Sequence, residues 1–307
     1  MPNQNKNSIV GSKPQSKPTA SDKEHEYWTP ERRAAAKPFP LPKHEAKKTE
    51  GEAVERPQPQ GETGHVTPGH PKHGSHETKN HGTQSDSGGS AVANPLIYPY
   101  STCGKLFFTQ GGNDYSGSAS VVARNILLTA GHCVHNNGAW STNVAFYPSY
   151  PEGKLHYSYS YEAAWTAWVN SSQRAYDYGM IWIENNPGDQ LGWLGILWNA
   201  STSGRTWEAV GYPATPNPPF NGDAMDHTTG SFASSSTSGT IGLNNDNMEH
   251  GSSGGPWITD FNGSPREYAN GLQSFHIHDG DFTEYGPYFT QDVKGLYDWI
   301  SNPANRH

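Results

Sequence analysis

The stretch Gly251-Ser252-Ser253-Gly254-Gly255-Pro256 decides how this chain of 307 residues is interpreted, because it places a serine among flexible residues. Glycine adopts backbone dihedrals that other residues avoid, so neighbouring N–H groups can point at one spot. Two such donors suit the stabilisation of an oxyanion. On its own the stretch is equally compatible with an ordinary loop, since Ser234-Ser235-Ser236 is a second serine cluster.

A histidine directly follows an apolar run in Leu128-Thr129-Ala130-Gly131-His132-Cys133. The small residues before it predict a turn at the rim of a sheet. An imidazole at a rim can exchange protons near neutral pH. Alone, His132 is equally compatible with a structural role.

A carboxylate precedes a strongly apolar strand in Tyr176-Asp177-Tyr178-Gly179-Met180-Ile181-Trp182-Ile183. Partial desolvation at this position requires a hydrogen-bond donor for Asp177. A histidine N–H is a suitable donor, and the pairing would fix the tautomer that a general base needs. The alternative is an aspartate that caps a turn.

The three segments occur in the order His, Asp, Ser, and two of them carry family-like local sequences. Thr129-Ala130-Gly131-His132-Cys133 is similar to the Thr-Ala-Ala-His-Cys motif of the chymotrypsin family, and residues 251–256 are similar to its Gly-Asp-Ser-Gly-Gly-Pro motif. The resemblance covers roughly residues 100–303 and looks closest to secreted microbial members, including the glutamyl-endopeptidase branch. It implies an all-β fold of two packed six-stranded antiparallel β-barrels with a C-terminal helix.

The resemblance also implies a serine endopeptidase with His132, Asp177 and Ser253 as its catalytic triad. Ser253 would form an acyl-enzyme, and the N–H groups of Gly251 and Ser253 would form the oxyanion hole. Asp189 is the fallback for the carboxylate. No metal or organic cofactor is expected, and the expected partner is a peptide or protein substrate bound by a monomer.

Substrate-binding residues follow from a further match. Gly271-Leu272-Gln273-Ser274-Phe275 resembles the family strand Gly-Ile-Val-Ser-Trp. By that resemblance Ser274 hydrogen-bonds Asp177, and Ser274, Phe275 and His276 pair with the substrate backbone.

The base of the specificity pocket departs from the family's best-known patterns. Asn247 lies six residues before Ser253, where an aspartate would select Lys or Arg, so cleavage after those residues is not expected. Glutamyl-specific members place histidine where Gln273 falls, so the resemblance does not establish Glu specificity. Ser252 replaces the aspartate that animal members use to bind a new N-terminus.

Two cysteines, Cys103 and Cys133, are expected to form a disulfide, with two buried thiols as the alternative. Closing a loop of about 30 residues would contribute roughly 3.5 kcal/mol. The family partner is expected 16 residues before Cys133, where Gly117 stands, so Cys103 would have to substitute.

The first 93 residues differ in composition from the rest. They carry 13 Lys/Arg and 11 Asp/Glu, against 8 and 18 in the remaining residues. Rich in Pro, Lys, Glu, Gly and His, residues 1–93 are predicted to be largely disordered, a pro-segment and linker before a peptidase domain at 94–303 and a tail at 304–307. Within them Thr29 and Pro30 predict the start of a short helix, and Tyr27 and Trp28 are candidates for docking on the domain.

The histidines at 65, 70, 73, 76 and 81 form a loose tract that favours a solvated linker over a metal site. Met1 to Val10 lacks the apolar stretch of a secretory signal, so either an upstream signal is missing or export takes another route. Secretion is expected by resemblance.

Short apolar runs separated by turn residues predict a β-rich body after residue 100. The predicted strands are 105–109, 118–123, 126–130, 144–147, 180–183, 206–211, 256–259 and 271–275. Val293, Leu296, Tyr297 and Ile300 recur with helical spacing near the C-terminus. No basic stripe or run of 18 apolar residues is present, so neither nucleic acid nor membrane is expected as a partner.

Two other interpretations compete. Gly251-x-Ser253-x-Gly255 fits the nucleophile elbow of α/β-hydrolases, but that fold orders its residues Ser, Asp, His and alternates strands with helices. A catalytically inactive, protease-like binding module is the second alternative. It is disfavoured because all three triad positions are intact.

Overall fold

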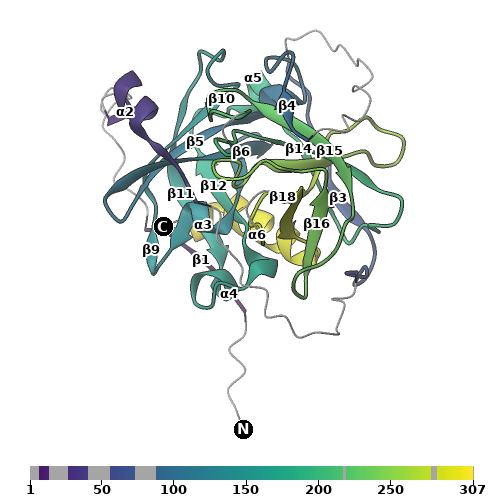
Figure 1. Cartoon of the computed structure of the whole chain (residues 1–307). Coiled ribbons are helices and arrows are strands. Elements are labelled where there is room, and N and C mark those ends of the chain that lie inside the picture. The colour runs from purple at the N-terminus through teal and green to yellow at the C-terminus, as the bar shows by residue number, and fades with distance from the viewer. Residues whose placement is uncertain are drawn as a thin grey trace.

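The computed structural model describes residues 7–13, 27–40, 56–72, 88–216, 219–277 and 282–306, and most of them lie in or between β-strands (Figure 1). The N-terminal elements are β1 (Ile9–Gly11), α2 (Pro30–Ala35), β2 (Lys37–Pro38), β3 (Gly64–Val66), β4 (Ser90–Ala91) and η1 (Tyr100–Thr102). The next group is β5 (Cys103–Gln110), β6 (Asn113–Ala123), β7 (Ile126–Thr129), α3 (Gly131–Val134), β8 (His135–Asn136), β9 (Ala139–Trp140), β10 (Thr142–Pro148), β11 (Tyr157–Trp165), α4 (Thr166–Val169), η2 (Arg174–Tyr176) and β12 (Gly179–Ile183). The last group is α5 (Gly188–Leu191), β13 (Gly195–Trp198), β14 (Thr206–Gly211), β15 (Asp226–Ser231), β16 (Thr240–Asn244), β17 (Pro256–Thr259), β18 (Tyr268–Leu272), β19 (Thr283–Pro287), α6 (Gln291–Ser301) and η3 (Pro303–Asn305).

Six strands close into the first barrel. The ring runs β5, β6, β7, β12, β11, β10 and back to β5, and each neighbouring pair is antiparallel. Its interior is filled by fully buried side chains such as Leu106, Phe108 and Val121. Closure leaves no unpaired edge within the ring, which is how small β-barrels avoid exposed backbone. In Figure 1 these strands form the teal half of the molecule.

The second barrel also has six strands, but two of its seams are single bridges. β17, β14 and β15 pair in that order, β18 pairs with β17, and β16 pairs with β19. The isolated bridges Phe232↔Leu243 and Phe275↔Tyr285 join the hairpin to the other strands. The core of this barrel contains the fully buried Trp257. The prediction of two six-stranded barrels is therefore confirmed.

The C-terminal helix is confirmed as α6. Thr290 caps it by accepting a hydrogen bond from the N–H of Asp292, and its apolar face is buried. That face comprises Val293, Leu296 and Ile300, which recur at the predicted spacing. α6 packs against β11, β12 and β13.

Each predicted strand overlaps an observed strand, but several bounds differ; β6, for example, begins at Asn113 instead of residue 118. Strands 206–211 and 256–259 match β14 and β17, whereas the predicted strand at 271–275 is β18, which ends at Leu272. The shift arises because Ser274 and Phe275 turn their N–H groups toward the carbonyl oxygen of Tyr285 instead of continuing the β17 ladder. The sequence did not predict β11, β13, β15, β16 or β19.

The described parts of residues 1–93 are short ordered pieces that lie on both barrels. β1 pairs with β11, β2 with β6, β3 with β13 and β4 with β15. The helix predicted at Thr29 is confirmed, because the Thr29 side chain accepts from the N–H of Arg32 at the start of α2. Trp28 docks with 2% of its surface exposed. The division into 1–93, 94–303 and 304–307 stays a prediction.

The histidine tract is described only at His65 and His70; residues 73, 76 and 81 lie outside the described ranges. His65 contacts the rings of Phe261 and Tyr268, and His70 Nε2 lies 2.8 Å from Glu267 Oε2. Within the described ranges, no three His, Cys, Asp or Glu side chains cluster as metal ligands would.

The predicted disulfide is wrong, because both cysteines are free and buried. Cys103 lies opposite Ser120 in the β5–β6 ladder, and Gly117 lies three positions further along, which is about 10 Å. A Cβ atom placed on Gly117 would be 3.2 Å from Cys133 Sγ. Cys133 therefore faces Gly117, the position at which the family has the partner cysteine. Cys103 lies too far along β5 to form a disulfide with Cys133 instead.

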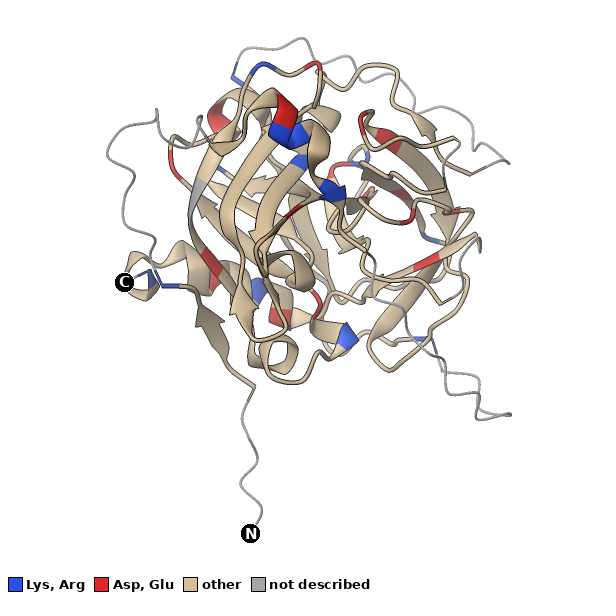
Figure 2. Cartoon of the chain, turned by 60° about the vertical axis from the view of Figure 1, so that its left-hand side comes forward, with Lys and Arg blue, Asp and Glu red and all other residues tan. Residues whose placement is uncertain are grey.

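Charged residues are scattered over the elements in Figure 2, and no element is coated by one sign. No helix in the described ranges combines the length and apolar character that crossing a bilayer requires. The exclusion of nucleic acid stays a prediction.

Candidate active site

Two neighbouring strands bring His132 and Asp177 together. β7 and β12 are antiparallel, and Thr129 lies opposite Gly179. His132 follows Thr129 by three residues, and Asp177 precedes Gly179 by two, so both emerge at the same end of the pair. The short helix α3 then turns the His132 imidazole toward the carboxylate.

The Asp177 carboxylate holds His132 by two hydrogen bonds. The backbone N–H of His132 donates to Asp177 Oδ1 at 2.8 Å, and Nδ1 lies 2.9 Å from Oδ2. Ser274 Oγ donates to the same Oδ2 at 2.5 Å, as the resemblance implied. Arg174 Nη1 lies 3.9 Å from Oδ2. The imidazole is therefore fixed with Nε2 pointing away from the carboxylate.

Electrostatics favour the ionised carboxylate. Burial alone would raise the pKa of Asp177, but His132, Arg174 and the Ser274 hydroxyl outweigh it and lower that pKa. For His132 burial favours the neutral ring, yet the neighbouring Asp177 raises the pKa of the imidazole above its ordinary value. The pair thus stabilises a proton on His132.

Ser253 lies on the loop between β16 and β17 of the second barrel, and glycines on both sides set its conformation. Gly251 has φ +95° and Gly254 has φ +84°. A Cβ atom on Gly251 would be 2.6 Å from the Tyr212 carbonyl oxygen, and one on Gly254 would be 2.2 Å from Thr129 Oγ1. Side chains at either position would push this loop away from its neighbours.

Ser118, on β6 of the first barrel, forms hydrogen bonds across the contact between the barrels to the loop that carries Ser253, here called the serine loop. Its N–H donates to the Ser253 carbonyl oxygen at 2.7 Å, and its hydroxyl donates to the Gly251 carbonyl oxygen at 3.0 Å. The same hydroxyl accepts from the N–H of Tyr212 at 2.9 Å. The Ser253 carbonyl oxygen also lies 3.9 Å from Sγ of Cys133, the residue after His132, so the serine loop of the second barrel packs against α3 of the first.

Four polar groups at this place have no hydrogen-bond partner among the described residues. They are His132 Nε2, Ser253 Oγ and the backbone N–H groups of Gly251 and Ser253. The N–H of Ser252, between the last two, donates to the Glu249 carbonyl oxygen. His132 and Ser253 are both fully buried and are not bonded to each other. Unpaired buried polar groups are rare in proteins and call for an explanation.

Phe39, from the N-terminal region, covers the imidazole. Its ring stacks on the His132 ring with centroids 5.3 Å apart and planes 19° apart. Pro38 lies against Gly251, because a Cβ atom on that glycine would be 3.4 Å from the proline Cβ.

The predicted substrate-binding residues Ser274, Phe275 and His276 follow β18, and each makes contacts of its own. Ser274 touches Asp177, and the Phe275 ring stacks on Tyr285 with Arg174 5.2 Å above it. His276 is buried, with Nδ1 4.0 Å from Glu284 Oε1.

The predicted pocket base makes local contacts of its own. Asn247 Oδ1 accepts from the N–H of Gly89 at 2.9 Å. Gln273 is held between Trp257 and Asp246 by two hydrogen bonds, and burial raises the pKa of Asp246 to about 7.

Asp189, the fallback carboxylate, pairs with Arg124 at 2.6 Å at an exposed position instead of with His132. Sequence reasoning missed Ser118, Arg174 and Phe39. Only Arg174 carried a signal, since a lone cation three residues before a buried aspartate is a candidate partner for it.

Two antiparallel six-stranded barrels followed by a C-terminal helix are the architecture of the chymotrypsin-like class of proteases. The trypsin family model matches residues 99–300, about two-thirds of the chain. The chain therefore belongs to the trypsin family.

Solved structures support this assignment. The protease Anisep from Arthrobacter nicotinovorans is 31% identical, with a TM-score of 0.58, over 64% of this chain and 94% of that one. The thermostable serine protease AL20 from an extremophilic microorganism is 29% identical, with a TM-score of 0.56, over 66% and 97%. Among curated proteins, the extracellular metalloprotease of Bacillus subtilis is 28% identical over 132 residues, which are 40% of this chain and 42% of that protein.

Proposed function

We propose that the protein is a secreted serine endopeptidase that cleaves peptide bonds through His132, Asp177 and Ser253. The observation that carries the proposal is the fixed His132–Asp177 pair: among the described residues its Nε2 has no hydrogen-bond partner, and neither has the buried hydroxyl of Ser253, whose loop packs against Cys133. In apo structures the hydrogen bond between base and nucleophile is often absent and forms only with substrate.

In the proposed reaction Ser253 Oγ attacks the scissile carbonyl carbon while His132 Nε2 accepts the hydroxyl proton. The N–H groups of Gly251 and Ser253 hold the developing oxyanion. The leaving amine takes the proton back from His132, and water then hydrolyses the acyl-enzyme by the same route. Asp177 stays ionised and orients the imidazole throughout.

The free N–H groups support the oxyanion role. Of the three consecutive residues 251–253, the outer two have N–H groups with no acceptor in the described part of the chain, while the N–H of the middle one is bonded within its own turn. Two donors aimed at one oxygen act strongly in a site without water, with removal of one typically costing about 10²–10³ in kcat.

A fluorophosphonate probe tests the proposed function. We expect the processed enzyme to be labelled on Ser253, and Ser253→Ala to abolish labelling together with hydrolysis of casein. Absence of labelling and hydrolysis in folded, processed protein would favour an inactive, protease-like binding module.

We also propose that residues 1–93 are a pro-segment, cut near residues 88–97 in an exported protein. The abrupt change in charge and composition there motivates the proposal. The name of the extracellular Bacillus subtilis relative supports export. N-terminal sequencing of active material tests it, and activity in molecules that all retain Met1 would refute it. Profiling a peptide library would then define the cleavage preference.

A further inference from the structure

The described segment 27–40 crosses the first barrel and ends on the reacting groups. We propose that it is an internal inhibitor, in which Phe39 and Pro38 occupy the substrate site and Tyr27, Trp28 and Arg32 anchor the segment to the barrel. The inference rests on the proposed function, since an inhibitor presupposes an active site. The proposed ligand of this barrel face is the segment itself, in which an aromatic anchor is followed by an extended Pro-Phe-Pro peptide.

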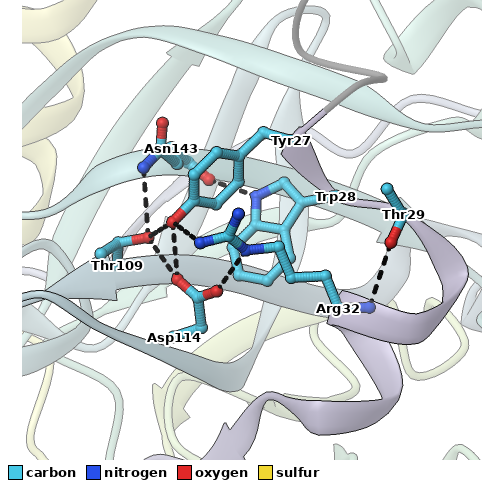
Figure 3. A network of polar contacts seen from close by, with 7 residues as sticks. All are labelled: Tyr27, Trp28, Thr29, Arg32, Thr109, Asp114 and Asn143. Carbon is cyan, nitrogen blue, oxygen red and sulfur yellow. Dashed lines mark hydrogen bonds and ion pairs between the residues drawn. The ribbon is translucent and has the colours of Figure 1, made fainter.

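The anchor is a network of polar contacts on β5, β6 and β10 (Figure 3). The Tyr27 hydroxyl donates to Asp114 Oδ1 at 2.8 Å, and Arg32 Nε donates to Asp114 Oδ2 at 2.6 Å. The Arg32 guanidinium also lies 3.7 Å from the centre of the Tyr27 ring. Asp114 therefore binds two residues of the segment at once.

Beside this network, Trp28 fills an apolar site. Its ring packs 5.2 Å from that of Phe107 with only 2% of its surface exposed, and its indole N–H donates to the Asn143 carbonyl oxygen. A buried aromatic with its polar atom satisfied is the usual chemistry of a strong interface contact.

The helix α2 connects the anchor to the extended arm. It starts at its Thr29 cap and ends at Ala36, after which Lys37 and Pro38 pair in parallel with Tyr115 and Ser116 of β6. The N–H of Phe39 donates to the Ser116 carbonyl oxygen at 2.8 Å.

Proline at 38 and 40 suits an arm of this kind. Neither proline has an N–H to leave unsatisfied, and both favour extended backbone, so little freedom is lost when the arm binds. Between the two prolines only Phe39 has a backbone N–H, and that group donates to the Ser116 carbonyl oxygen.

The arm covers the catalytic groups without bonding to them. Phe39 lies on the His132 imidazole and against Tyr115, at 4.9 Å between ring centroids. Pro38 lies against Gly251 of the serine loop, and Nε2 of His132 and Oγ of Ser253 are both buried without a partner in the described ranges. A segment with only a structural role would be expected to satisfy such buried groups. Leaving them unpaired destabilises the covered state, and the anchor compensates.

The test measures the rate at which a fluorophosphonate labels the intact chain, followed at the mass of residues 1–307. We expect Phe39→Ala to be labelled at least tenfold faster than wild type. Asp114→Asn leaves the arm unchanged but weakens its anchor, so labelling should rise about threefold or more. Phe261→Ala is the matched control, because that phenylalanine contacts N-terminal His65 on the other barrel. It should be labelled at the wild-type rate.

Thermal unfolding of each variant verifies that it is folded, and Asp114→Asn decides the question if Phe39→Ala does not fold. Wild-type intact chain that is labelled as fast as these variants would overturn the inhibitor. So would labelling of Phe39→Ala and Asp114→Asn at the wild-type rate in folded intact chains. If the proposed function is wrong, the result is distinguishable, because neither the intact chain nor the processed protein would be labelled on Ser253.

Discussion

In the first barrel each pair of neighbouring strands forms a ladder, whereas the second barrel is closed at two seams by single bridges. The first barrel holds His132 and Asp177 as a bonded, buried pair at the ends of β7 and β12. The second presents Ser253 on a loop shaped by glycines, where the N–H groups of Gly251 and Ser253 have no hydrogen-bond partner among the described residues.

In the proposed mechanism this difference separates two tasks. The regular barrel would fix the group that must keep one tautomer and one orientation. The irregular barrel would provide groups that must stay unbonded until charge develops on the substrate. Changes in the first barrel should therefore alter proton transfer, and changes in the second should alter stabilisation of the oxyanion.

The largest effect is expected at the bonded pair. Asp177→Asn keeps the side-chain shape but favours the wrong imidazole tautomer, so kcat should fall by roughly 10⁴ with little change in Tm. Asp189→Asn, at the exposed pair with Arg124, is the control and should retain the wild-type rate. Steady-state peptide hydrolysis measures both, and a near-wild-type rate for Asp177→Asn would assign the orienting role to another residue.

The next effect is expected in the serine loop. Gly251→Ala should lower kcat by about 10²–10³, because the new methyl group meets the Tyr212 carbonyl oxygen and tilts an oxyanion donor. Gly263→Ala is the matched control, because Gly263 also has a positive φ but a new Cβ atom there would have no other atom within 4 Å. It should cost about 1 kcal/mol of stability and leave kcat unchanged. Equal losses of kcat in both variants would contradict a specific role for Gly251.

A pH profile tests the first barrel without mutation. Because Asp177 raises the pKa of His132, the acid limb of kcat/KM should lie above the ordinary imidazole value of about 6.5, with roughly tenfold loss per pH unit below it. The contribution of His132 to stability is complete below about pH 6.5 and is lost as pH rises through its raised pKa, whereas that of Asp177 is lost as pH falls through its lowered pKa. Asp177→Asn should move the limb to lower pH, and an unmoved limb would exclude His132 as the titrating group.

The smallest effect concerns the joint between the barrels. Ser118→Ala leaves the Gly251 carbonyl and the Tyr212 N–H without their partner, so the free energy of unfolding should fall by about 1–3 kcal/mol. Ser120→Ala removes a buried hydroxyl that has no hydrogen-bond partner in the described ranges, and it should be close to neutral. Chemical denaturation compares them, and equal stabilities would show that the Ser118 contacts contribute little.

The sequence predicted what local patterns encode. The Thr29 cap and the spacing of Val293, Leu296 and Ile300 act within a few residues, so both helices were found. His132 and Asp177 were predicted from the order of three segments and their likeness to family motifs, and the register of β7 and β12 explains why the two side chains meet.

Features that depend on distant partners were missed. β15, with the sequence Asp-His-Thr-Thr-Gly-Ser, is a strand only because β14 and β4 flank it. Phe39 stands between two prolines in a charged region, and nothing local indicates that it stacks on His132. The bridge between Cys103 and Cys133 was predicted wrongly because sequence separation does not reveal the distance between Cα atoms.

The Cys133 thiol faces Gly117 instead of a second cysteine, and this has a consequence for the folding of the protein. Neither barrel depends on a covalent cross-link, so assembly does not wait for an oxidant and tolerates reductants. Burial raises the pKa of Cys103 to about 12, which keeps it in the unreactive thiol form. The fold can therefore form at any redox potential that its surroundings impose.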